Sequence, residues 1–184
     1  MADGIKQLLY SVIDSIGKDR IRKDITADTD SAARTYSAEI IDRCAGMLGK
    51  SQNDEATMGT LCEALLHFML TAALLPSERK VTTAAGAELD IVVPSTKVLQ
   101  KEPSKALVIQ VIKGGGEQAA EKIRRAKAAQ PAAENIWTIS AKPVAAGSRN
   151  YTLSGGKYKY SSIIPDIRAF LADKGSTGSL KLIH

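Results

Sequence analysis

The run Ala106-Leu-Val-Ile-Gln-Val-Ile112, followed at once by Lys113 and three glycines (114–116), decides the fold of this chain. Seven mostly aliphatic residues in a row are typical of a central strand that is buried on both faces. Downstream, apolar residues recur at helical spacing over 117–130, and a further strand is expected over 135–140. A right-handed crossover through that helix makes the two strands parallel.

Two shorter strands are expected upstream of this run. They span 80–84 and 88–93, with Ala85-Gly86 as the turn between them and Pro94 ending the second, so they form a hairpin. Residues 95–105 read as a polar loop. The order from residue 55 is helix, strand, strand, strand, helix, strand, which predicts an α/β protein with a mixed central sheet flanked by helices.

Helical periodicity dominates the first 75 residues. We expect helices over 3–16, 31–48 and 55–75, and a connector with little periodicity over 18–30. Residues 1–54 are predicted to form an N-terminal helical extension packing on the core. Its first helix is an arm that docks either on the body of the protein or on a partner chain, the second alternative giving a homodimer.

The helix expected over 55–75 is apolar almost all round and should be largely buried. One polar stripe interrupts it at three- and four-residue steps, formed by Thr60, Glu63, His67 and Thr71. A second small hairpin is expected over 151–160 around Gly155-Gly156, followed by a short helix over 165–172. The α/β core is then 55–175, and 176–184 is a flexible tail.

The composition is that of a soluble globular protein. In 184 residues, 44% are hydrophobic and 24% charged, with a mean hydropathy of -0.10, which excludes disordered, collagen-like and membrane-embedded chains. Aromatic residues make up only 4%, so a nucleic-acid surface built on stacked aromatic side chains is not expected. The net charge of +5 permits anionic partners.

The cysteine count points to a reducing compartment. Cys44 and Cys62 both fall in apolar helical patterns, so we expect buried free thiols, with neither a disulfide framework nor a zinc site. The N-terminus lacks the pattern of a signal peptide, and the most apolar stretch, 59–75, is short for a membrane span and contains Glu63 and His67. We expect a cytoplasmic protein without membrane association.

A carboxylate and an ammonium group can meet on this sheet. Asp90 lies in the second strand and Lys113 ends the third, and adjacent strands hold such residues close together. In metal-assisted phosphodiester hydrolysis, carboxylates hold a hard divalent ion that activates water, and a lysine steadies the phosphate or the water.

The layout over about 55–140 resembles the PD-(D/E)XK, or restriction-endonuclease-like, nuclease superfamily. Carried over residue by residue, the resemblance implies a catalytic set of Glu63 on the first core helix, Asp90 on strand two, Lys113 as the triplet lysine and Gln118 as the optional polar residue of the next helix. The triplet here reads Val111-Ile112-Lys113, so a valine stands where the family has its second metal-binding carboxylate.

Glu88 is the expected replacement for that missing acid. Strand alternation places it on the face of Asp90 and sends Gln110 to the face opposite Lys113. The resemblance then implies Mg²⁺ held by Asp90, Glu63 and Glu88. Two ordinary alternatives compete, namely a solvated Glu88 and a Glu63 that pairs with His67 one helical turn on.

Basic residues suggest a second kind of contact. Five of them, Arg124, Arg125, Lys127, Lys157 and Lys159, are candidates for gripping nucleic-acid phosphates. The alternative is that Glu121 pairs with Arg124 or Arg125 and solvates this face. The glycines at 114–116 are taken as a tight turn, since no nucleotide-binding fingerprint follows them.

Two functional hypotheses follow. The first is a nucleic-acid-binding protein with a nuclease-like core, either a divergent Mg²⁺-dependent phosphodiesterase or a relative that has lost cutting. The second is a non-catalytic interaction module that forms a homodimer through its N-terminal helices. Because a fold hosts many functions, the site must separate them.

Overall fold

The computed structural model describes residues 2–179 and contains a six-stranded mixed sheet in the order β1-β2-β3-β4-β5-β6. The strands are β1 (Glu78–Thr82), β2 (Glu88–Val93), β3 (Leu107–Ile112), β4 (Ile136–Ser140), β5 (Arg149–Thr152) and β6 (Tyr158–Lys159). The pairs β1–β2 and β2–β3 are antiparallel, and the pairs from β3 to β6 are parallel. The predicted α/β class, hairpin and parallel crossover are confirmed.

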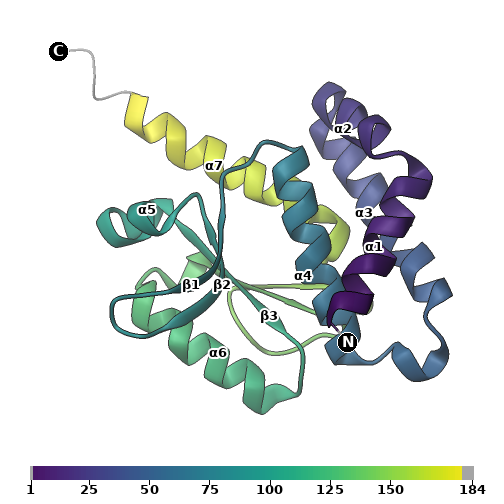
Figure 1. The fold of residues 1–184 in the computed structure, drawn as a ribbon. Coiled ribbons are helices and arrows are strands. Elements are labelled where there is room, and N and C mark those ends of the chain that lie inside the picture. Colours follow the sequence, from purple (N-terminus) through teal and green to yellow (C-terminus); the bar gives the residue numbers. More distant parts are fainter. Residues whose placement is uncertain (1, 180–184) are drawn as a thin grey trace.

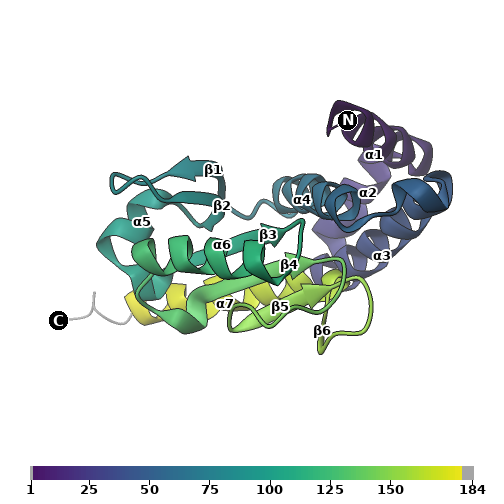
Figure 2. The ribbon, with the colours of Figure 1, turned by 90° about the horizontal axis from the view of Figure 1, so that it is seen from below.

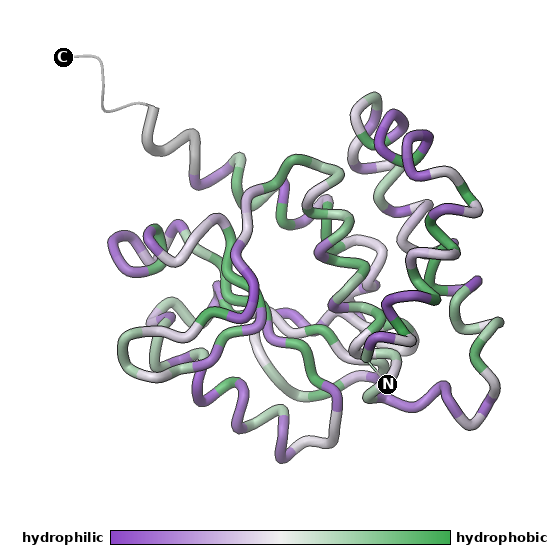
Figure 3. The backbone as a smooth tube through the Cα atoms, viewed as in Figure 1, coloured by the Kyte–Doolittle hydropathy of each residue, from purple (hydrophilic) through white to green (hydrophobic). Residues whose placement is uncertain are grey.

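Helices cover both faces of the sheet (Figures 1 and 2). Helices α4 (Glu55–Ala72) and α7 (Ile163–Ser179) pack on one face, and α5 (Thr96–Lys101) and α6 (Gly116–Ala129) pack on the other. Alternate residues of β3 serve the two faces, since Ile109 and Val111 join the core beneath α4 while Val108 joins the core beneath α6. Burial on both faces explains why this strand is aliphatic at every position except Gln110. Figure 3 shows the correspondingly hydrophobic α4.

Three helices form the N-terminal part: α1 (Ala2–Ile16), α2 (Lys18–Ala27) and α3 (Thr29–Met47). Their apolar side chains belong to the same core cluster as those of α4, so α1 docks on the body of its own chain. The connector predicted over 18–30 is wrong. Ile21 and Ile25, one helical turn apart, are fully buried, and Gly17, with φ 106°, makes the break between α1 and α2.

The segment predicted as a polar loop over 95–105 is also helical. It contains α5, capped by the Ser95 hydroxyl, which accepts from the Val98 N–H, and a 3₁₀ turn, Pro103–Lys105. Leu99 is the buried residue of α5. One inward-facing leucine gives no helical periodicity, so the sequence pattern did not predict this helix. Further 3₁₀ turns span Lys50–Gln52, Ala133–Asn135 and Tyr160–Ser162.

The hairpin predicted over 151–160 is wrong, because β5 and β6 pair in parallel, with Tyr151 opposite Tyr158. After Gly155 and Gly156 the chain loops back over Thr152 and then runs in the original direction. The Tyr160 hydroxyl donates to the carbonyl oxygen of Cys62 in α4 at 2.7 Å, and this buried bond helps hold the returning segment against the helix. A tertiary contact thus overrides the local turn signal.

The last helix, α7, is longer than the predicted 165–172 and runs to Ser179. Four residues of the predicted tail are therefore helical, and 180–184 lie outside the described residues. Both cysteines are free and buried, as predicted. Within residues 2–179 we find no helix with the length and apolar character needed to cross a membrane.

Candidate active site

The structure gathers Glu63, Asp90 and Lys113 into one charged cluster. Glu63 lies in the middle of α4, Asp90 lies in β2, and Lys113 directly follows β3. Lys113 Nζ is 2.7 Å from Glu63 Oε2, and both carboxylates are buried, with side chains only 5% (Glu63) and 11% (Asp90) exposed. The predicted meeting of acids and lysine at this part of the sheet is therefore present.

A lysine that the sequence did not single out joins the two acids. Lys80 Nζ, from β1, lies 2.7 Å from Glu63 Oε1 and 3.2 Å from Asp90 Oδ1. Lys122 of α6 completes the set with its Nζ 2.5 Å from Asp90 Oδ2, and Arg79 lies 3.7 Å from Glu63. The cluster thus contains four cations and two carboxylates.

The backbone is irregular where these residues meet. Lys80 has φ 51°, in the left-handed region, and the β1–β2 register pairs Arg79 with Ile91 and Val81 with Leu89 on either side of it. Successive residues of a regular strand point to opposite faces, yet Arg79 and Lys80 both reach Glu63. The left-handed conformation at Lys80 makes this convergence possible.

Gly59 allows α4 to lie close to the end of β3. A Cβ at this position would be 2.8 Å from Lys113 Cγ and 3.3 Å from the carbonyl oxygen of Ile112. Without a side chain there, the stem of Lys113 crosses α4 and its ammonium reaches Glu63, one helical turn along.

The charges of the cluster stabilise one another. Burial on its own would raise the pKa of Glu63, but Lys113 and Lys80 outweigh it and hold that pKa below its ordinary value. Burial likewise opposes ionisation of Asp90, and Lys122, the Val111 N–H and Lys80 together lower its pKa. The pKa of Lys80 is raised, because Glu63 and Asp90 outweigh its desolvation. Both acids are therefore carboxylates and Lys80 is an ammonium at neutral pH.

Three buried polar atoms in this region lack a hydrogen-bond partner among the described residues: Glu63 Oε1, Arg79 Nε and His67 Nδ1. Glu63 Oε1 nevertheless has Lys80 Nζ 2.7 Å away, and the two groups form a close ion pair. The proposed Glu63–His67 pairing is not seen, because Glu63 faces Lys80 of β1 and Lys113, which follows β3, instead.

Two glutamines near the site have structural partners. Gln118 Oε1 accepts from the Lys113 N–H at 2.8 Å, which fastens the glycine turn to the start of α6. Gln110 is buried on the face opposite Lys113, as alternation predicted. It accepts from the Asp90 N–H and donates to the carbonyl oxygens of Glu88 and Lys122, so it links β2, β3 and α6.

Glu88 does not join the acids. Its side chain is 74% exposed and pairs with Arg125 of α6 at 3.3 Å. The expected shared face fails because alternation in β2 breaks between Leu89, which packs beneath α6, and Ile91, which packs beneath α4. The solvated alternative is the one found.

These residues do not fit a divalent metal ion as they stand. Val111 is fully buried in the apolar core, Glu88 points away, and lysines already face the oxygens of Glu63 and Asp90. Across residues 2–179, no group of three His, Cys, Asp or Glu side chains is placed to hold a metal. The predicted ligand set of Asp90, Glu63 and Glu88 is thus not assembled.

The basic residues fall into separate groups. Arg124 and Arg125 both pair with Glu121, at 2.7 and 2.9 Å, and lower the pKa of its carboxyl to about 2. Lys127 is exposed on the same helix. Lys157 and Lys159 lie beside or in β6, at the opposite edge of the sheet from β1, and are also exposed.

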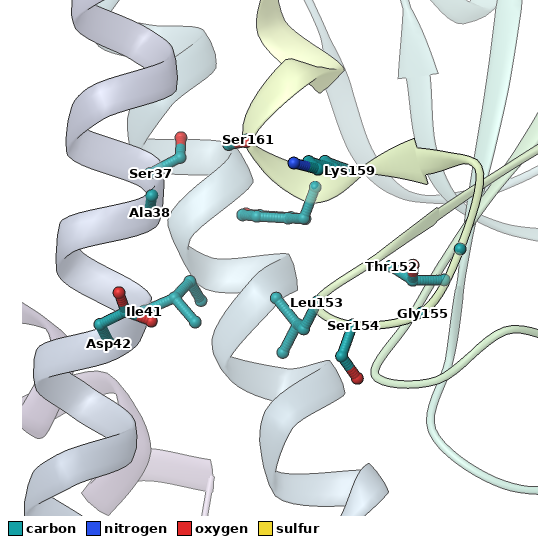
Figure 4. Close-up of a pocket in the computed structure, with 12 residues that line it drawn as sticks. Ser37, Ala38, Ile41, Asp42, Thr152, Leu153, Ser154, Gly155, Lys159 and Ser161 are labelled. Atoms are coloured by element: carbon teal, nitrogen blue, oxygen red, sulfur yellow. The ribbon is translucent and has the colours of Figure 1, made fainter.

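Lys159 also lines a cavity of about 350 Å³ between α3 and the segment 152–161 (Figure 4). Ser37 and Asp42 of α3 face Thr152, Ser154 and Lys159 across it. None of the residues that line this cavity belongs to the Glu63–Asp90 cluster, so it is a separate feature.

The comparisons with known proteins bear on the fold. No family model and no curated protein matches this chain. Among solved structures, one described as "Restriction endonuclease PspGI-substrate DNA complex" is similar, with a TM-score of 0.59 and 12% sequence identity, over 92% of this chain and 93% of that chain. The protein therefore has a restriction-endonuclease-like fold. The likeness extends well beyond 55–140 and includes part of the N-terminal helices.

Neither Lys80 nor Lys122 is among the site residues predicted from the sequence. A hairpin centred on Ala85 places residue 80 across from residue 90, so the position of the turn was enough to predict that Lys80 lies beside Asp90. Lys122 lies four residues after Gln118 and therefore on the same side of α6, the side that faces β3.

Proposed function

We propose that this protein binds DNA through the surface around Glu63, Asp90, Lys80, Lys113 and Lys122, and that binding needs no metal ion. One observation carries the proposal: with Arg79 included, four cations face two carboxylates in a cluster on a restriction-endonuclease-like sheet. A surplus of positive charge attracts the phosphate backbone.

The exposure of the lysines to solvent supports DNA binding at this surface. Lys80 is 59% exposed, so its charge is open to solvent although it touches both acids, and Lys113 and Lys122 are partly exposed. The similar solved structure is a complex with substrate DNA, which favours DNA as the partner to test first.

The test is DNA binding measured by fluorescence anisotropy in EDTA, over a series of salt concentrations. We expect affinity to fall steeply with salt, and Lys80→Ala and Lys113→Ala each to reduce the slope of log K against log salt by about 1. Lys97→Ala is the matched control. It removes an exposed lysine of α5, which lies at the opposite end of β3 from Lys113.

Other outcomes assign the other functions. Absence of salt-dependent binding would contradict the proposal and favour the interaction module. Cleavage of DNA that requires Mg²⁺ and disappears in Asp90→Asn would instead identify a divergent phosphodiesterase.

A further inference from the structure

The ammonium of Lys80 lies between two carboxylates that come from different elements. Its Nζ contacts one oxygen of Glu63 and one of Asp90, at 2.7 and 3.2 Å. The remaining oxygen of each acid faces another lysine, Lys113 at 2.7 Å and Lys122 at 2.5 Å. One cation thus bridges the two acids, and two more lie on their outer sides.

We infer that Lys80 is the built-in cation of this site: it occupies the place between Glu63 and Asp90 that a divalent metal ion needs, and it keeps Mg²⁺ and Mn²⁺ out. The inference concerns the cluster itself and does not depend on nucleic-acid binding.

The position of Lys80 is set by the backbone as well as by its flexible side chain. A lysine with φ 51° adopts a conformation that residues with a Cβ rarely take. The surrounding β1–β2 ladder holds it there, with regular pairs at Arg79–Ile91 and Val81–Leu89. The strand is thus irregular at the one residue whose side chain bridges the acids.

The electrostatics of the cluster exclude a second cation while Lys80 is present. A metal ion would approach three ammonium groups that already lie within 3.2 Å of the same two carboxylates. Like charges at such separations repel strongly in a partly buried site. The missing third acid, replaced by the buried Val111, leaves nothing to offset this repulsion.

The same contacts predict what removal of Lys80 does. Glu63 Oε1 is buried and faces Lys80 Nζ at 2.7 Å, so its charge depends on this neighbouring ammonium. Without the ammonium, this oxygen and Asp90 Oδ1 face a common space. Two carboxylate oxygens are ligands that hard divalent cations prefer. Removal of Lys80 therefore creates a divalent-cation site.

Titration with Mn²⁺ tests the inference, with free Mn²⁺ followed by electron paramagnetic resonance in the absence of nucleic acid. We expect no specific binding to the wild type. We expect Lys80→Ala to bind one Mn²⁺ per chain, with an affinity at least about tenfold above the detection limit that bounds the wild type, because one repelling charge is gone. Adding Asp90→Asn to this variant should abolish the binding.

Arg79→Ala is the matched control. It removes one positive charge from the neighbouring residue, which lies 3.7 Å from Glu63, and leaves Lys80 in place. Lys80→Met, which keeps an unbranched stem, provides a second uncharged variant, and circular dichroism checks that each variant is folded. The inference is overturned if wild-type protein binds Mn²⁺ in a way that Asp90→Asn removes. It is equally overturned if folded Lys80 variants bind no more tightly than Arg79→Ala.

Discussion

At the scale of single residues, the central feature is a pair of buried carboxylates neutralised by lysines that are themselves partly exposed. Glu63 and Asp90 are both at least 89% buried at the side chain, and an unpaired charge at such depth is strongly destabilising. Lys80 is more than half exposed, so its ammonium serves the acids without being fully desolvated. The lysines can therefore neutralise two buried acids at a modest desolvation cost of their own.

The lowered pKa values of Glu63 and Asp90 predict how stability depends on pH. Unfolded carboxyl groups titrate near pH 4, above the folded values, so the unfolded chain binds protons first as the pH falls. The stabilisation is complete above about pH 5 and is lost as the pH falls through the folded pKa values. Urea unfolding at several pH values should show wild-type stability decreasing in this acidic range.

Glu63→Gln should make that decrease shallower, because one linked group is removed. Glu117→Gln, on the exposed first turn of α6, serves as the control and should retain the wild-type steepness. Equal pH dependence for Glu63→Gln and the wild type would contradict the assignment of this linkage to the cluster.

At the scale of elements, helix α2 shows how two residues decide a structure. Its mean composition is strongly hydrophilic, but Ile21 and Ile25 lie on one side and are fully buried against the neighbouring helices. Tyr36 of α3 also donates a hydrogen bond to Asp24 at 2.5 Å, which ties the two helices together. The segment is therefore part of the folded body and not a linker.

Truncation of these side chains tests the role of α2. Ile21→Ala and Ile25→Ala should each lower the free energy of unfolding by about 2–5 kcal/mol, as for other fully buried isoleucines. Lys23→Ala, exposed on the same helix, should change it by less than about 0.5 kcal/mol. Urea denaturation measures both effects. Near-zero effects at the isoleucines would favour the connector that the sequence predicts for 18–30.

At the scale of the whole molecule, one apolar cluster unites the N-terminal helices with the sheet. It runs from Leu9 and Ile13 in α1 through Leu65 and Leu66 in α4 to Trp137 in β4. Because α4 lies between the helical extension and the strands, neither side has a complete core without it.

The homodimer and the cytoplasmic location remain predictions.

This shared core predicts a single unfolding transition. Trp137, the one tryptophan of the chain, is buried in the sheet and reports on it by fluorescence, whereas the helices dominate circular dichroism at 222 nm. The two signals should give the same midpoint during thermal unfolding. Separate midpoints would mean that the helical extension folds independently of the sheet.

The order of the core elements was determined by sequence alone. The double-sided burial of 107–112, the turn at Ala85-Gly86 and the periodicity of α4 and α6 are local patterns, and local patterns are sufficient to place strands and helices in order. The same patterns placed Glu63, Asp90 and Lys113 on neighbouring elements. The local patterns failed where a contact between residues distant in sequence outweighed them. At Tyr160, the hydrogen bond to α4 accompanies a parallel pairing of β5 and β6, where the sequence predicted a hairpin.

Only the tertiary structure decided the chemistry of the site. Which cation lies between Glu63 and Asp90 depends on the left-handed backbone at Lys80, on the broken alternation in β2 and on the reach of Lys122 from α6. Each of these depends on geometry between elements, and strand periodicity carries no information about it. The sequence shows which residue types are available for a site. The contacts that each side chain makes are set by the packing that brings separate elements together.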